Sequence, residues 1–100
     1  MQNKRNNYRL SPLAEKDLEE IWLYSFTNWS LEKADEYHKN IVSAFEDLAQ
    51  GTKIGSAVDV RENYQKYIIG SHIIFYHFSD SNLKIIRILH QQMDISRYLV

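Results

Sequence analysis

The C-terminal half of this 100-residue chain contains side chains with the chemistry needed to cleave RNA. They are two arginines, one histidine and one tyrosine: Arg61, Arg87, His90 and Tyr98. An arginine can hold a phosphate group while a histidine or a tyrosine moves protons. These residue types raise the hypothesis of a metal-free RNA endonuclease.

The spacing of these residues argues against a shared catalytic site. Arg87 stands between Ile86 and Ile88 in a β-branched run, which predicts a strand. Successive strand residues point to opposite faces, so we expect Arg87 and His90 to lie on opposite sides of the sheet. We therefore predict no catalytic residues. Arg and Tyr are enriched at binding hot spots, so we expect a contact surface for a macromolecular target, formed by Arg61, Arg87, His90, Arg97 and Tyr98.

A metal site is not predicted from the four histidines of the chain. His72 and His77 are five residues apart, so they face opposite sides of one strand, and no carboxylate stands two residues from either. Gly-rich phosphate loops and the common hydrolase motifs are also missing. We expect no metal and no cofactor.

Length and composition predict one small folded domain over residues 1–100, with a polar and flexible start at residues 1–7. The chain is 44% hydrophobic and 13% aromatic, which suffices for a single core. It has no cysteine and no apolar run near the roughly 20 residues that span a bilayer. We expect a cytoplasmic protein without a membrane partner.

Charge is distributed unevenly along the chain. Residues 1–50 carry six Lys/Arg against nine Asp/Glu, a balance of −3, whereas residues 51–100 carry six against four, a balance of +2. An excess of two positive charges is too small for a free-standing nucleic-acid binder. We expect no direct DNA binding by the chain alone, while a local basic patch for an acidic partner stays open.

The N-terminal half predicts a short strand followed by two helices. Tyr8-Arg9-Leu10 is the strand, and Ser11-Pro12 is typical of a helix start. Apolar residues then recur at helical spacing for about 16 residues, and a second helix is expected from Ser30 to Gly51. So short a connection predicts an antiparallel hairpin. Trp22 and Trp29, seven apart, are expected in the core or in the contact between the helices.

The C-terminal half has the period of two that predicts strands. After a surface loop at residues 50–59, we expect strands over residues 64–69, 72–78 and 83–90, then a short helical tail over residues 95–99. The fold class is α+β in the order βααβββ. The helical hairpin is expected to pack on one face of a mostly antiparallel four-stranded sheet.

Both faces of the predicted sheet are apolar. One set of alternating positions holds Ile74, Phe78, Leu83, Ile85 and Leu89, and the other holds Ile73, Phe75, Ile86 and Ile88. Two helices cover one face, so the second face is expected to be an exposed groove for a protein partner. The alternative is that the 50–59 loop and the tail fold over it. The candidate partner-binding residues on either face are Ile74, Phe75, Ile85, Ile86 and Ile88.

Three blocks in this order resemble the ParE branch of the RelE/ParE superfamily of type II toxins. The first block is Leu10-Ser11-Pro12-Leu13-Ala14-Glu15-Lys16-Asp17-Leu18. The second block comprises Arg61, Tyr64, Gly70, His72, Phe75 and Tyr76, and the third comprises Arg87, His90 and Asp94. The resemblance extends from Tyr8 to Leu99. Two positions depart from it, since Gln65 and Gln92 stand where basic residues are common.

The resemblance implies a RelE/ParE-like fold and a toxin that inhibits DNA gyrase, traps cleaved DNA complexes and blocks replication. It implies a non-enzymatic inhibitor that is neutralised by a cognate antitoxin, whose C-terminal segment wraps the toxin. The expected partners are thus the antitoxin and DNA gyrase, in a homodimer or in a heterotetramer with the antitoxin. The alternative is a RelE-like ribosome-dependent mRNA interferase, which would use Arg61, Arg87, His90 and Tyr98.

Overall fold

The computed structural model describes residues 7–59 and 61–99 of the chain. Except for Asn7, the segment expected to be flexible at residues 1–7 lies outside the described residues. The elements are, in chain order, β1 (Tyr8–Leu10), α1 (Pro12–Asn28), α2 (Leu31–Gln50), β2 (Ser56–Ala57), β3 (Gln65–Ile69), β4 (His72–Ser79), β5 (Asn82–His90) and α3 (Ile95–Tyr98). This is the predicted α+β order with one additional strand, β2.

The two long helices begin and end where the sequence predicts. The Ser11 and Ser30 hydroxyls each accept a hydrogen bond from the amide three residues on, and Pro12 occupies the first turn of α1. Gly51 ends α2 in the left-handed conformation, with φ of 81°. Within the ranges that the structure describes, no helix is both long and apolar enough to span a membrane.

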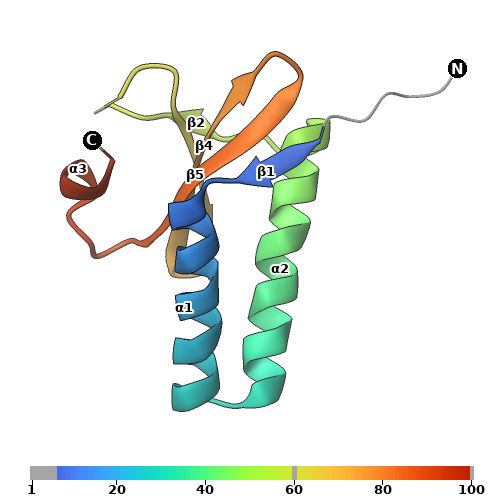
Figure 1. Ribbon diagram of the computed structural model, residues 1–100, viewed down its shortest axis with the longest axis vertical. Helices are drawn as coiled ribbons and strands as arrows, with labels where there is room; N and C mark the ends of the chain where they lie inside the picture. The colour runs from blue at the N-terminus through green and yellow to red at the C-terminus, as the bar shows by residue number, and fades with distance from the viewer. Residues whose placement is uncertain (1–6, 60, 100) are drawn as a thin grey trace, which may run out of the picture.

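The sheet has five strands in the order β1-β5-β4-β3-β2, rather than the four predicted. β1 pairs parallel to β5, and the other neighbours are antiparallel. The fifth strand, β2, lies inside the segment expected to be a loop. Figure 1 shows α1 and α2 side by side, with the turn between them extending beyond the sheet.

A β-bulge in β5 changes the predicted alternation. The register between β4 and β5 shifts at Phe75/Tyr76, and Ile86 is the additional residue on β5. Beyond the bulge, Ile88 faces the helices and Leu89 faces the opposite side, the reverse of the prediction. One inserted residue is enough to exchange the faces because the strand period is two.

Each face of the sheet has its own apolar cluster. The larger cluster lies between the helices and the sheet and includes Ile74, Ile85 and Ile88, which are buried. The smaller cluster, on the opposite face, comprises Ile73, Phe75, Leu89 and Leu99, with partly buried residues around it that include Val58 and Ile86. The expectation of an exposed second face is therefore wrong. The chain itself covers this face, because Leu99 and Val58 fold onto it.

Candidate partner-binding surfaces

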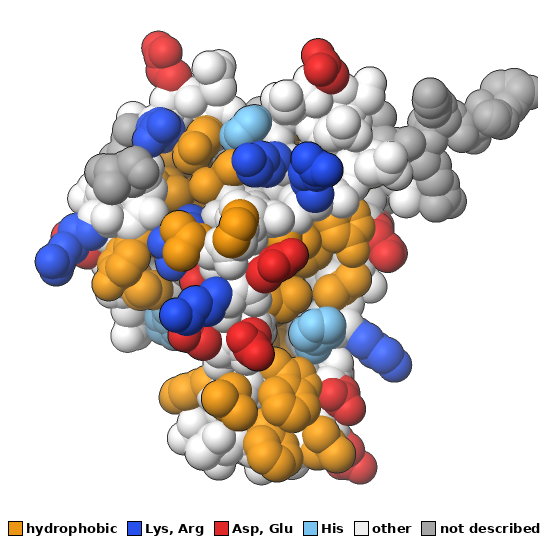
Figure 2. All heavy atoms as spheres, in the orientation of Figure 1, with side chains coloured by type: hydrophobic (Ala, Val, Ile, Leu, Met, Phe, Trp, Pro, Cys, Tyr) orange, Lys and Arg blue, Asp and Glu red, His pale blue; other side chains and the backbone are white. Residues whose placement is uncertain are grey.

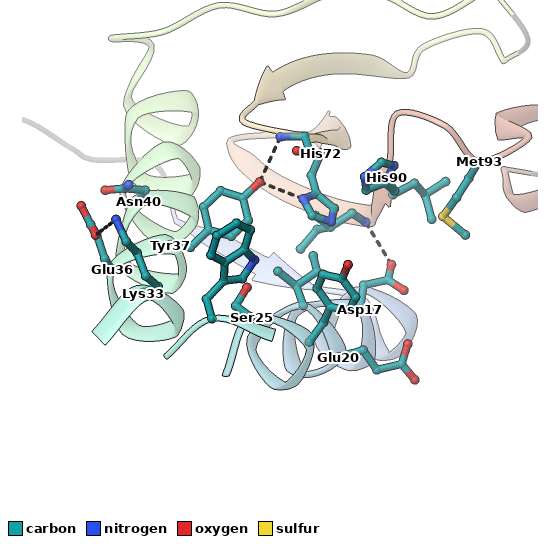
Figure 3. Close-up of a pocket in the computed structure, with 16 residues that line it drawn as sticks. Asp17, Glu20, Ser25, Lys33, Glu36, Tyr37, Asn40, His72, His90 and Met93 are labelled. Atoms are coloured by element: carbon teal, nitrogen blue, oxygen red, sulfur yellow. Dashed lines mark hydrogen bonds and ion pairs between the residues drawn. The ribbon is translucent and has the colours of Figure 1, made fainter. Parts of the chain in front are cut away.

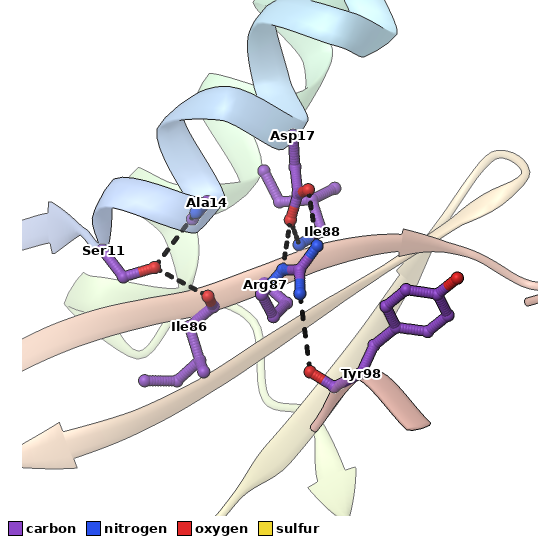
Figure 4. A network of polar contacts seen from close by, with 7 residues as sticks. All are labelled: Ser11, Ala14, Asp17, Ile86, Arg87, Ile88 and Tyr98. Carbon is purple, nitrogen blue, oxygen red and sulfur yellow. Dashed lines mark hydrogen bonds and ion pairs between the residues drawn. The ribbon is translucent and has the colours of Figure 1, made fainter. Parts of the chain in front are cut away.

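Arg87, the first candidate for phosphate chemistry, is bound inside the molecule. Its Nε donates to Oδ2 of Asp17 at 2.8 Å and its Nη2 donates to Oδ1 at 2.9 Å, a bidentate pair (Figure 4). The Asp17 carboxylate also accepts the amide of Ile88 at 3.0 Å. The two charged side chains are only 11% and 14% exposed, and the hydrogen bond to Asp17 raises the pKa of Arg87 above its usual value. Arg87 therefore joins β5 to α1.

Arg87 and Arg61 also hold the C-terminal segment, residues 95–99. Nη1 of Arg61 donates to the carbonyl of Leu99 at 3.1 Å, and Nη1 of Arg87 donates to the carbonyl of Tyr98 at 3.5 Å. Each guanidinium also lies near an aromatic ring: Arg61 is 5.0 Å from the ring centroid of Tyr64, and Arg87 is 5.7 Å from that of Tyr98. These contacts fix the backbone that places Leu99, only 4% exposed, on the second sheet face.

The structure divides the predicted nuclease set between two places. Arg61, Arg87 and Tyr98 surround the C-terminal segment, whereas His90 lines a groove on the helix side of the sheet. In that groove His90 Nδ1 accepts the amide of Gln92 at 3.1 Å. Arg97, the remaining predicted target contact, is exposed on α3. Neither Arg61 nor Arg87 is among the residues that line the groove of His90.

The groove has a volume of about 910 Å³ and runs between the helical hairpin and the adjoining ends of β4 and β5 (Figure 3). Apolar lining comes from Ile21, Ile88, Leu89 and Met93, and two aromatic residues, Tyr24 and Trp29, also line it. Its charged residues include Asp17, Glu20, Lys33 and Glu36. Asp17 is paired with Arg87, and Nζ of Lys33 lies 3.9 Å from Oε1 of Glu36. The groove therefore combines an apolar lining with acidic residues.

A tyrosine–histidine pair forms one wall of this groove. The Tyr37 hydroxyl lies 2.8 Å from Nδ1 of His72 and accepts the amide of Ser71 at 3.2 Å (Figure 3). Burial, followed by the nearby His90, lowers the pKa of His72 to about 4. His72 is therefore uncharged at neutral pH, and the wall carries no positive charge there.

Glycine is required in the turn beside this wall. Gly70 has a φ of 57°, and a Cβ there would approach the Tyr37 hydroxyl to 2.6 Å. The tight turn between β3 and β4 can therefore pack against α2. Within the described ranges, no group of three or more His, Cys, Asp or Glu side chains could hold a metal ion.

The turn between α1 and α2 carries exposed aromatic and aliphatic side chains, and one of them is Trp29, which the sequence predicts in the core or in the contact between the helices. Trp22 meets the expectation of a contact between the helices, because its Nε1 donates to Asp35 at 3.0 Å. Trp29 does not, since it is 74% exposed. Figure 2 shows hydrophobic side chains gathered over this end of the hairpin. We call this surface the hairpin tip and define it by Leu23, Tyr24, Phe26, Trp29 and Leu31, all of which are exposed.

Charge separates the hairpin from the rest of the chain. Residues 12–50 hold nine Asp/Glu and three Lys/Arg, a net charge of −6. The other residues hold four Asp/Glu and nine Lys/Arg, a net charge of +5. Division of the sequence at its midpoint hides most of this asymmetry, because the boundary follows the fold rather than the chain length.

Two pairs of residues that organise these surfaces give no local signal. Asp17 is 70 residues from Arg87, and Tyr37 is 35 residues from His72. An acidic residue near a helix N-terminus is explained by the helix dipole alone, so the sequence does not identify Asp17 as a partner of Arg87.

Comparisons with known proteins identify the family. A family described as the ParE toxin of the type II toxin-antitoxin system, parDE, matches residues 8–95. Toxin ParE1 of Mycobacterium tuberculosis (strain ATCC 25618 / H37Rv) is 36% identical over 96 residues, which cover 94% of this chain and 98% of that toxin. Toxin ParE1 of Caulobacter vibrioides is 36% identical over 93 residues, which cover 92% of this chain and 96% of that toxin.

Solved structures share the architecture at low sequence identity. The chromosomal ParDE TA system from P. aeruginosa matches with a TM-score of 0.76 at 17% identity, over 86% of this chain and 96% of that chain. The toxin–antitoxin complex RelBE2 from Mycobacterium tuberculosis matches with a TM-score of 0.64 at 18% identity, over 92% of this chain and 98% of that chain. These matches confirm the predicted RelE/ParE-like fold. The sequence comparisons, which cover nearly the whole chain, show that it belongs to the ParE toxin family of type II toxin–antitoxin systems.

Proposed function

We propose that this ParE toxin inhibits DNA gyrase and blocks replication, and that it acts in the cytoplasm as a protein inhibitor rather than as an enzyme. The observation that carries the proposal is the bidentate pair between Arg87 and Asp17. The guanidinium of Arg87 already donates to a buried carboxylate and to the carbonyl of Tyr98. Few of its N–H donors are therefore free to bind the phosphate of an RNA substrate. Family membership supports the same conclusion.

The test compares two reactions of the purified protein. Incubation with gyrase, ATP and relaxed plasmid should block supercoiling and accumulate cleaved DNA complexes. Incubation with translating ribosomes should leave the mRNA intact. Cleavage of ribosome-bound mRNA together with unchanged gyrase activity would overturn the proposal in favour of the RelE-like mRNA interferase.

A cognate antitoxin is the second proposed partner. The RelBE2 match is itself a toxin–antitoxin complex, which supports an antitoxin partner for this chain. On the second sheet face, Phe75 and Ile86 are the candidates for antitoxin contact, reached when the C-terminal segment is displaced. Ile74, Ile85 and Ile88 lie beneath the helices, so substitutions there would act through the core. A homodimer and a heterotetramer with the antitoxin stay as the proposed assemblies.

A further inference from the structure

The hairpin tip is an apolar surface whose five defining side chains are all exposed. Trp29 is 74% exposed and Tyr24 is 66% exposed, although both are large aromatic residues. The nine residues from Leu23 to Leu31 contain no charged side chain. Exposed apolar patches of this kind mark interaction sites in soluble proteins.

Local structure does not require the aromatic side chains at the tip. Trp29 ends α1 through its backbone, because its amide donates to the carbonyl of Ser25 at 2.8 Å. The indole adds nothing to this cap. Trp22, seven residues earlier, contrasts with it because its ring stacks on Phe26 and its Nε1 bonds to Asp35. A surface function is therefore the better explanation for the indole of Trp29.

The charge around the tip indicates the chemistry of its partner. Glu20, Glu32 and Glu36 lie on the helix segments that flank the tip, with Lys33 among them, and the whole hairpin has a balance of −6. A partner surface of positive potential with an apolar pocket would complement this arrangement. Enzymes that bind DNA have such positive surfaces, because they must neutralise phosphates.

A second copy of the chain is a poorer occupant. The five tip side chains expose on the order of 600 Å² in all, if a large apolar residue offers about 150–250 Å² when fully exposed. A stable interface buries about 800 Å² per partner. Two tips would also bring two acidic hairpins together, and like charges repel. A larger positive partner would contact both the tip and the acidic residues around it.

We propose that the hairpin tip is the surface by which this toxin contacts DNA gyrase, with Trp29 and Tyr24 in an apolar pocket on a positively charged part of the enzyme. This inference rests on the function proposed above and adds the contact surface and its chemistry. It differs from the sequence-based expectation that Arg61, Arg87, His90, Arg97 and Tyr98 contact the target.

The test uses the full-length double variant Trp29→Ser/Tyr24→Ser. Its matched control is Ile54→Ser, which changes a side chain that is 81% exposed and lies outside the tip. The concentration for half-maximal inhibition of gyrase supercoiling should rise at least about tenfold for the tip variant and stay within twofold for the control. Thermal unfolding should be unchanged in both variants, and binding to the cognate antitoxin should stay within twofold.

The other outcomes overturn the inference in distinguishable ways. If the folded tip variant inhibits gyrase as wild type does, the tip is not the contact. If it loses antitoxin binding and keeps gyrase inhibition, the tip belongs to the antitoxin. If the wild-type protein itself does not inhibit gyrase, the proposed function fails, and the assignment of the tip to gyrase fails with it.

Discussion

The sheet end of this molecule carries Arg61 and Arg87, and the hairpin tip carries Tyr24 and Trp29. The arginines have the chemistry of a catalytic site, yet their guanidinium groups are occupied by Asp17 and by the backbone of the C-terminal segment. The aromatic residues have the chemistry of a core, yet they are exposed. Residue type alone would place a reactive site at the arginines and a core at the aromatic residues, whereas the structure shows bound arginines and exposed aromatic side chains.

The comparison predicts that loss of the buried carboxylate has the largest effect on stability. Asp17→Ala leaves the Arg87 guanidinium unpaired and the Ile88 amide without its acceptor. We expect the free energy of unfolding to fall by about 3–5 kcal/mol, measured by urea denaturation. Glu36→Ala, which removes an exposed ion pair with Lys33, should cost no more than about 1 kcal/mol. Similar losses in the two variants would show that Asp17 is not the structural partner of Arg87.

The C-terminal segment should rank next, because one buried side chain anchors it. Leu99→Ala removes the residue that covers Phe75 and Leu89, and we expect a loss of about 2–4 kcal/mol in the free energy of unfolding. Arg97→Ala, a change at an exposed residue of the same segment, should have little effect on stability. Deletion of residues 96–100 should lower the melting temperature as well. A truncated protein of unchanged stability would mean that the segment is not a structural cap.

Protonation of His72 should weaken the groove wall at acid pH. Its pKa is about 4 in the folded chain and about 6.5 when unfolded, so the unfolded state binds the proton first as the pH falls. The contribution of neutral His72 to the free energy of unfolding is fully present above pH 6.5 and is lost as the pH falls toward 4. Between pH 7 and pH 5 we expect a loss of about 1–2 kcal/mol, seen as a steeper pH dependence of unfolding in wild type than in His72→Gln. Parallel curves for the two proteins would contradict the burial of a neutral His72.

The acidic residues beside the tip should have the smallest effect, mainly on the rate of association. Neutralisation of Glu32 and Glu36 to Gln should slow binding to gyrase about two- to fivefold at low salt, and added salt should remove the difference. Glu46→Gln/Asp47→Gln makes the same change of net charge toward the other end of α2. An equal effect of both double variants in surface plasmon resonance would show that total charge, rather than its location, matters.

The sequence predicts most of the fold because its signals are local. Ser11-Pro12, Ser30 and Gly51 mark the ends of the helices, and the change of period from helix to strand marks the sheet. The bulge at Ile86 has no comparable signal, and it exchanges the faces of Ile88 and Leu89. A single unpredicted residue in a strand thus changes which side chains are buried together.

The candidate surfaces are less predictable because they depend on long-range contacts and on exposure. The bond between Asp17 and Arg87 spans 70 positions, and the cover provided by Leu99 depends on the path of the chain after β5. Helical spacing places Trp22 and Trp29 on the same face, but Trp29 follows the last residue of α1 and is 74% exposed. Periodicity does not show where along a helix face the burial ends.

Replacement of the buried ion pair by uncharged residues tests whether Arg87 has a structural role and does not contact the target. In Asp17→Asn/Arg87→Met, the amide oxygen can still accept the Ile88 amide while both charges are removed, and such replacements of buried pairs are often tolerated. The measurement is inhibition of gyrase supercoiling by this folded double variant. We expect inhibition within about threefold of wild type. A folded double variant that no longer inhibits gyrase would contradict it, because Arg87 would then act on the target itself.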